Sequence, residues 1–376
     1  MNKAIFFTPE SPSYDSSGGR VVLSDLLSLL VSFQVIYLGP KISDKVALLL
    51  QGHGLIEYRY LSDHFPLSRI FCFITLQRNK YELNACILTV LLYFKCPNLS
   101  FFFQQYTRSW SCLYLYSRLF KNESTVVRIH NIENQYYAQN HKKRLLARFH
   151  IYVSELLSSN IAMNFITLSR SDYSFFVKKL PNTVNVKWCL PRDVPQEMAL
   201  LSANAYSDLQ LEKHDFLLLA DYRAKFNIDS LRAFVNANIK FLDFHNLKVL
   251  VAGRKPTIYQ DKIYLEELNA IPNFSVLTDF TDVSIVYQQC SILVLPDLYG
   301  AGLKMRVIES FRFNTPIIAT KEVLDGYGML PSEICIILPP NHLLLPSIEC
   351  INSLKSSAKN ALCFEYWSSN FKSIAS

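Results

Sequence analysis

Two cations and a carboxylate lie close together in the segment that follows a short apolar run, Ile292 to Leu295. Lys304 and Arg306 come near the start of a helical hydrophobic period, and Glu309 falls about one turn further on. Basic residues at a helix N-terminus oppose the helix dipole, so their position favours a bound anion. A diphosphate would supply that anion and share the free amide groups of the helix start. The carboxylate of Glu309 could accept hydrogen bonds from a sugar diol.

The residues around this set predict a strand, a glycine-bearing loop, a helix and a second strand. Pro296 ends the first strand. Gly300 and Gly302 allow a tight turn that leaves backbone amides uncovered. Asn314 can adopt the left-handed conformation that ends a helix, and the apolar residues 317–319 form the next strand. The alternative is an ordinary strand-loop-helix unit with a surface glutamate and two solvated cations.

The pattern G-x-G-x-K-x-R-x-x-E, followed by T-P-I-I-A-T and a glycine, resembles the nucleotide-sugar site of group 1 glycosyltransferases, of the family 4 type. The resemblance implies that Glu309 binds the donor ribose and that Lys304 and Arg306 bind its diphosphate. Ala301 stands where the first glutamate of the family motif is expected, and Asn314 stands where a glycine is usual. The resemblance also implies the GT-B fold, an α/β fold of two Rossmann-like domains that face each other across a cleft.

The length of the chain, 376 residues, predicts two domains rather than one core. Strands alternate with helices in two successive series, as in doubly wound parallel sheets. We expect an acceptor-binding domain over residues 1–190, a polar linker over 191–214 and a nucleotide-sugar-binding domain over 215–352. The GT-B resemblance adds a C-terminal helix over 353–376 that crosses back to the first domain.

The first domain opens with a strand, a polar loop and a helix, and the loop ends in Gly18-Gly19. In the family such a glycine loop approaches the donor phosphates, so the resemblance makes Gly19 a candidate catalytic-site residue. A plain helix start is the alternative. Asp15 lies in the same loop and would be a general base if the reaction inverts the anomeric carbon.

A second polar cluster, His130-Asn131-Ile132-Glu133, directly follows the predicted strand Thr125 to Ile129. Open α/β sheets bind ligands at the carboxyl ends of their strands. The cluster resembles the H-N-x-E segment of group 1 glycosyltransferases. That resemblance implies that His130 faces the transferred sugar and that Asn131 and Glu133 contact the acceptor. A purely structural histidine is the alternative.

Two loops of the second domain complete the predicted donor site. Arg223 and Lys225 follow its first strand, where the family carries a cation near the diphosphate. We prefer Arg223, because its guanidinium presents a planar fork of donors. Thr278 and Asp279 follow a later strand, where the resemblance places the nucleotide base. A glycine is common at the position of Asp279.

The composition and the absence of certain motifs indicate which cofactors and which cellular location to expect. The chain has no D-x-D pair, no zinc-ligand spacing and no Walker loop, so we expect transfer without a metal or other cofactor, from a UDP-sugar co-substrate. Nine cysteines without a C-x-x-C pair, and no signal-peptide pattern, predict a cytoplasmic protein.

Basic residues concentrate in the first half of the chain. Cys72 to Arg148 holds eleven Lys and Arg against three Asp and Glu, whereas the net charge of the whole chain is +7. An anionic lipid surface on the inner face of the cell membrane would suit this window, and a solvated basic face is an equal alternative. No nucleic-acid-binding motif is present, so a nucleic-acid partner is not expected.

The sequence therefore predicts a hexosyltransferase-type glycosyltransferase. It would move a sugar from a nucleotide-sugar donor to a carbohydrate or lipid-linked acceptor in surface-polysaccharide assembly, and the resemblance implies retention of configuration. Two alternatives remain: a nucleotide-sugar 2-epimerase of the same fold, and a non-catalytic GT-B partner subunit. Ala301 and Asn314 keep the second alternative open.

Overall fold

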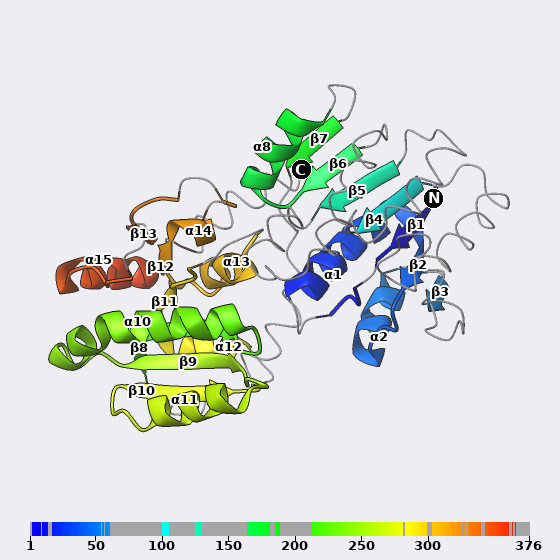
Figure 1. Ribbon diagram of the computed structural model, residues 1–376. Coiled ribbons are helices and arrows are strands. Elements are labelled where there is room, and N and C mark those ends of the chain that lie inside the picture. Colours follow the sequence, from blue (N-terminus) through cyan, green and yellow to red (C-terminus); the bar gives the residue numbers. More distant parts are fainter. Residues whose placement is uncertain are drawn as a thin grey trace. The chain divides into compact units, whose positions relative to one another are not determined.

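The computed structural model divides the chain into two compact units, Met1–Val194 and Pro195–Ser376. The division falls within the range predicted as linker. Each unit is built on a parallel β-sheet with helices packed against it (Figure 1). The structure describes residues 2–8, 10–13, 17–53, 55, 57–60, 100–104, 125–129, 164–180, 185–188, 213–280, 283–298, 303–324, 326–327, 330–339, 343–360, 363 and 365.

Within the described residues, the sheet of the first domain has seven parallel strands in the order β3-β2-β1-β4-β5-β6-β7. The order reverses between β1 and β4, which makes this the switch point of the sheet. The strands are β1 (Asn2–Phe7), β2 (Phe33–Gly39), β3 (Glu57–Tyr60), β4 (Ser100–Gln104), β5 (Thr125–Ile129), β6 (Asn164–Thr167) and β7 (Asn185–Trp188).

Three helices of the first domain are described: α1 (Ser17–Leu30), α2 (Asp44–Gly52) and α8 (Arg170–Lys179). The apolar residues of α1 recur every three to four positions, which gives the helix one buried face. That face shares a core with α2 and strands β1 and β2, formed by Val22, Leu23, Leu26, Leu30, Val46, Leu50, Phe6, Val35 and Tyr37. The hydroxyl of Ser169 caps α8 by accepting from the amide of Asp172 at 3.0 Å.

The described part of the second domain forms a sheet of six parallel strands in the order β10-β9-β8-β11-β12-β13. In chain order this is the 3-2-1-4-5-6 arrangement of doubly wound nucleotide-binding sheets, with its switch point between β8 and β11. The strands are β8 (His214–Asp221), β9 (Val249–Arg254), β10 (Phe274–Thr278), β11 (Cys290–Leu295), β12 (Ile317–Thr320) and β13 (Cys335–Leu338).

The described helices of the second domain are α10 (Lys225–Phe244), α11 (Tyr259–Asn269), α12 (Val283–Gln288), α13 (Met305–Arg312), α14 (Lys321–Leu324) and α15 (Ile348–Lys359). In Figure 1, α10 and α11 lie alongside strands β8, β9 and β10. The core on this side joins residues of α10, α11 and α15 to inward residues of the strands. Asn314 follows α13 with a φ of 54°, the left-handed conformation predicted from sequence.

The C-terminal helix differs from its predicted bounds. We predicted a crossover helix from residue 353, but α15 begins at Ile348. Ile351 and Leu354 are buried in the second domain's core, which explains the earlier start: the helix needs both residues on one face to pack. Residues 366–376 lie outside the described part, so the predicted return to the first domain stays a prediction.

A buried amide fastens the segment before α15 to the longest helix of the domain. Asn238 of α10 donates to the carbonyl of Leu343 and accepts from the amide of Leu345, each at 2.7 Å. It also donates to the carbonyl of Phe234 at 2.8 Å. Asn238 is 1 % exposed, so the hydrogen bonds form in a region that excludes water.

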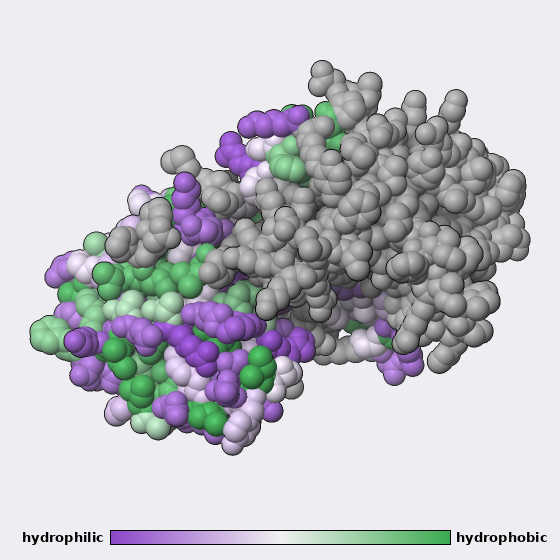
Figure 2. Space-filling model, in the orientation of Figure 1, coloured by the Kyte–Doolittle hydropathy of each residue, from purple (hydrophilic) through white to green (hydrophobic). Residues whose placement is uncertain are grey.

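The predicted α/β fold with two Rossmann-like halves is confirmed, because both sheets are parallel and doubly wound. Within the described ranges, no helix is long and apolar enough to cross a membrane. On the side seen in Figure 2, hydrophobic residues of the second domain are interspersed with hydrophilic ones. Most of the basic window from Cys72 to Arg148 lies outside the described residues, so the structure does not test the predicted lipid surface.

Candidate functional site

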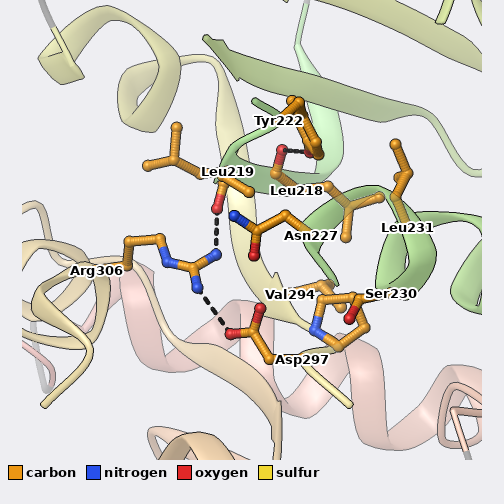
Figure 3. A pocket seen from close by; sticks show the side chains of 11 residues that line it. Leu218, Leu219, Tyr222, Asn227, Ser230, Leu231, Val294, Asp297 and Arg306 are labelled. Atoms are coloured by element: carbon orange, nitrogen blue, oxygen red, sulfur yellow. Dashed lines mark hydrogen bonds and ion pairs between the residues drawn. The ribbon is translucent and has the colours of Figure 1, made fainter. Parts of the chain in front are cut away.

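The carboxyl ends of β8 and β11 separate at the switch point of the second sheet. Their last paired residues are Leu217 and Leu293, whereas β8 stays paired with β9 as far as Asp221 and Arg254. A small hollow, partly open to solvent, lies beside the end of β8 on the side where pairing with β11 has stopped (Figure 3). Doubly wound sheets bind their ligands at this position.

Arg306 reaches from the first turn of α13 into this hollow (Figure 3). Its guanidinium donates to the carbonyl of Leu219 in β8 and pairs with the carboxylate of Asp297 at 2.7 Å. The Asp297 side chain is 3 % exposed and that of Arg306 is 18 % exposed. Arg306, one of the cations predicted to bind a diphosphate, therefore already has two partners inside the domain.

Lys304 precedes α13 and is half-buried. Among the residues that the structure describes, its ammonium has no hydrogen-bond or ion-pair partner. Burial lowers the pKa of Lys304 below its ordinary value; the nearby carboxylate of Asp297 opposes this shift and the charge of Arg306 adds to it. A partly desolvated cation that makes no direct ion pair favours an incoming anion.

Glu309 lies one turn further along α13 and is 7 % exposed. The hydroxyl of Tyr287 lies 3.5 Å from its Oε2 and 3.2 Å from the carbonyl of Arg306. The Tyr287 ring in turn stacks on Phe313, with centroids 4.9 Å apart. The carboxylate of Glu309, which we predicted to bind ribose, therefore lies beside the hydroxyl of a stacked Tyr287–Phe313 pair.

The two cations predicted after β8 both have acidic neighbours. Arg223 donates through Nε and Nη2 to the two carboxylate oxygens of Asp221, at 2.9 and 2.5 Å. Burial raises the pKa of Asp221. The hydrogen bonds and charge of Arg223, together with the charge of Arg254, lower it by more, so the pKa lies below its ordinary value. Lys225 pairs with Asp229 at 2.9 Å on the exposed start of α10.

Thr278 and Asp279 lie at the carboxyl end of β10, two strands away from β8. Asp279 has a φ of 58°, and its amide donates to the carbonyl of Gly253 at 2.9 Å. Its carboxylate accepts from the amide of Lys255 at 3.1 Å. Aspartate tolerates the left-handed conformation through such local hydrogen bonds, so it can stand where the family often has glycine.

The described part of the first-domain loop places a carboxylate against the start of α1. Gly19 is buried within α1. A Cβ added to Gly18 would lie 2.3 Å from both carboxylate oxygens of Glu10, so this position needs a glycine while Glu10 stays there. Glu10 was not predicted, although a carboxylate near a helix N-terminus is a recognisable sequence signal. Six predicted site residues lie outside the described part of the chain: Asp15, His130, Asn131, Glu133, Gly300 and Gly302.

Arg306 and Glu309 lie on α13 and Lys304 lies at its N-cap, while Arg223 follows the end of β8, whose Leu219 carbonyl Arg306 contacts. The structure adds Asp297, which sequence reasoning missed. The signal was present, because Asp297 follows directly after the buried strand β11 and Pro296. An aspartate that ends an apolar strand lies at the edge where ligands bind.

Comparisons with known proteins agree with this geometry. Residues 213–331 match the family described as Glycosyl transferases group 1. No curated protein has a significant match to the sequence.

Solved structures match over nearly the whole chain. HepE from Anabaena in complex with UDP and glucose has a TM-score of 0.62 at 10 % identity, covering 100 % of this chain and 95 % of HepE. Sucrose-phosphate synthase from Thermosynechococcus elongatus has a TM-score of 0.63 at 14 % identity, covering 100 % and 93 %. WaaG, a glycosyltransferase involved in lipopolysaccharide biosynthesis, has a TM-score of 0.57 at 12 % identity, covering 99 % and 95 %. The chain thus has the GT-B fold, and part of its second domain is similar to the group 1 glycosyltransferases.

Proposed function

We propose that this protein transfers a sugar from a nucleotide-sugar donor, and that Lys304 provides the main positive charge for the donor diphosphate. The observation that carries this proposal is the half-buried Lys304 ammonium, which makes no ion pair or side-chain hydrogen bond within the described residues. It lies at the switch point of a doubly wound sheet, where such sheets bind nucleotides. The group 1 match of residues 213–331 supports the same activity.

The remaining roles follow from the geometry of the same edge. Glu309 accepts hydrogen bonds from the ribose diol, because its carboxylate lies one turn beyond Lys304 in α13. Arg223 assists only after it exchanges Asp221 for a phosphate oxygen. Thr278 and Asp279 remain our candidates for contacts to the base. We keep the predicted roles of His130, Asn131, Glu133, Gly19, Asp15, Gly300 and Gly302 as proposals.

The chemistry that this site has to perform is the stabilisation of a leaving nucleoside diphosphate. Negative charge develops on the diphosphate as the glycosidic bond breaks, and a fixed cation in a partly desolvated position stabilises it more than water does. Lys304 fits this role, and the amides at the start of α13 would share it. Our proposal of transfer without a metal rests on the sequence, which has no D-x-D pair.

UDP is the nucleotide that we propose first, since the structure of HepE contains UDP and glucose. A surface-polysaccharide or lipid-linked acceptor is our proposal for the first domain, and WaaG, which acts in lipopolysaccharide biosynthesis, is one of the similar structures. Transfer of a hexose with retention completes the proposed reaction.

Titration calorimetry against UDP, GDP and ADP tests the proposal, followed by incubation with the matching nucleotide sugars. We expect one nucleoside diphosphate to bind and the corresponding sugar to be transferred to an added acceptor. Binding of none of the three would contradict a donor site and favour a non-catalytic partner subunit. Conversion of a nucleotide sugar to its epimer without any acceptor would favour the 2-epimerase.

A further inference from the structure

Asp297 is held at three points around the switch-point hollow. Its carboxylate pairs with Arg306 at 2.7 Å. Its carbonyl accepts from the hydroxyl of Thr320 at 2.8 Å, at the end of β12. The next amide, of Leu298, donates to the hydroxyl of Ser230 in α10 at 3.1 Å. The residue that ends the β11 edge is therefore fixed to three other elements.

On the side facing β11, the end of β8 is held by side chains instead of a paired strand. Arg306 donates to the carbonyl of Leu219, and Asn227 donates to the carbonyl of Asp221 at 2.7 Å. These contacts come after Leu217, where pairing with β11 stops. Arg306 thus spans the gap between the two strands, with one end of its guanidinium on β8 and the other on Asp297 (Figure 3).

We propose that the Asp297–Arg306 ion pair, which we call the clasp, positions Lys304 and the first turn of α13 for the donor diphosphate. In this view Arg306 is a positioning residue and does not itself bind phosphate. The inference rests on the proposed function, since it concerns the same donor site.

The burial of the clasp supports this assignment. To reach a ligand, Arg306 would have to leave the carboxylate of Asp297, whose side chain is 3 % exposed. An uncompensated buried carboxylate is strongly unfavourable. Lys304 lies two residues before Arg306 in the chain and makes no such contact, so it can meet an anion without breaking a buried pair.

The substitution Asp297→Asn separates the two roles of Arg306 by the sign of its effect. If the clasp positions Lys304, loss of the carboxylate charge loosens the first turn of α13. Because a displacement of about 1 Å is enough to cost up to roughly 100-fold, we expect the affinity for UDP to fall on the order of 10- to 100-fold. If Arg306 is instead a phosphate ligand restrained by Asp297, the same substitution releases it, and UDP binds as tightly as before or more tightly. Either of those two results would overturn the proposal.

A double-mutant cycle adds a second readout. Under the proposal, Asp297→Asn and Arg306→Met weaken UDP binding to a similar extent, and the double variant binds no more weakly than either single variant, because both remove the same clasp. The donor KM should follow these affinities, while binding of uridine, which lacks phosphates, stays within about twofold of wild type. Additive losses would show that Asp297 and Arg306 affect UDP binding independently, and would reject the clasp.

Asp215→Asn is the control, because it weakens another ion pair of the same domain, at the amino end of β8 and away from the carboxyl end that Arg306 contacts. Asp215 pairs with Lys355 of α15 at 2.5 Å, with side chains 26 % and 22 % exposed. We expect this variant to lower the melting temperature without weakening UDP binding. An equal loss of UDP affinity in Asp215→Asn and Asp297→Asn would mean that general destabilisation explains both, and would reject the proposal.

A measurement without nucleotide keeps this inference distinct from the proposed function. If the clasp holds α13, trypsin should cleave after Lys304 faster in Asp297→Asn than in Asp215→Asn, with no ligand added. Faster cleavage combined with no UDP binding by the wild-type protein would reject the proposed function while leaving the clasp intact. Equal cleavage rates would reject the clasp, whatever the protein binds.

Discussion

The substitution Lys304→Met removes an ammonium group while keeping an unbranched side chain of similar length. If this ammonium contacts the donor diphosphate, its loss weakens UDP binding. A hydrogen bond to a charged group contributes about 1.5–3 kcal/mol. Burial already lowers the pKa of Lys304 in the unliganded protein, so much of the cost of desolvating the ammonium is present before UDP arrives. We therefore take about 2 kcal/mol, which corresponds to roughly a 30-fold rise in Kd.

Titration calorimetry with UDP and uridine measures this effect, and Lys225→Met is the matched control. Lys225 is exposed and paired with Asp229, so its loss should change the Kd for UDP by less than about threefold. Uridine should bind all three proteins alike. A Lys304→Met variant that binds UDP within twofold of wild type would refute the role that we assign to this residue.

The same variant has a signature in pH. The pKa of Lys304 lies below its ordinary value in the free protein, and a bound diphosphate raises it. As pH rises through this lowered pKa, Lys304 of the free protein loses its proton and its positive charge. UDP binding then requires proton uptake and becomes weaker. Between about pH 7 and pH 10, wild-type affinity should fall and Lys304→Met should show no such fall. An identical pH profile for both proteins would contradict the assignment.

Three further substitutions test neighbouring features. Asp221→Asn frees Arg223 from its ion pair, so UDP should bind up to about fivefold tighter at low salt, and unchanged binding would mean that Arg223 does not reach the diphosphate. Glu309→Gln should weaken UDP binding by roughly tenfold but leave 2′,3′-dideoxy-UDP unaffected, whereas equal losses for both ligands would exclude a ribose contact. Gly253→Ala would place a Cβ 1.8 Å from the carbonyl oxygen of Ala220, so β8 and β9 must separate and thermal unfolding should show a loss of about 3 kcal/mol or more; an unchanged melting temperature would contradict the close approach.

The strands were the most predictable part of the fold, because strands buried on both faces are continuous apolar runs. Residues Thr125 to Ile129 form a strand with the predicted bounds. Helices were harder to delimit. The apolar spacing between Ile228 and Val235 indicates only about two turns of helix, but α10 runs over 20 residues, from Lys225 to Phe244. Its second half alternates polar and apolar residues without a stop signal, and packing against the sheet extends it.

The residues of the candidate site could be predicted from the sequence, but the ion pairs that they form could not. Sequence reasoning identified Lys304 and Arg306 as cations near a helix start and Arg223 as a cation after the first strand of the domain, and the structure places all three at the carboxyl edge of the second sheet. It did not foresee that Arg306 is bound by Asp297, nine residues earlier. That pairing depends on the path of the backbone between the two residues, which local propensity does not specify.

Asn238 has a consequence for the end of the chain. Because one amide group bonds to both sides of Leu344, through the backbone of Leu343 and Leu345, the approach to α15 is secured before the helix itself begins. Substituting this side chain by leucine would leave two peptide groups dehydrated and unsatisfied at once. A truncation after residue 346 and the single change Asn238→Leu should therefore produce a similar defect, in which the last helix no longer protects the core beneath it.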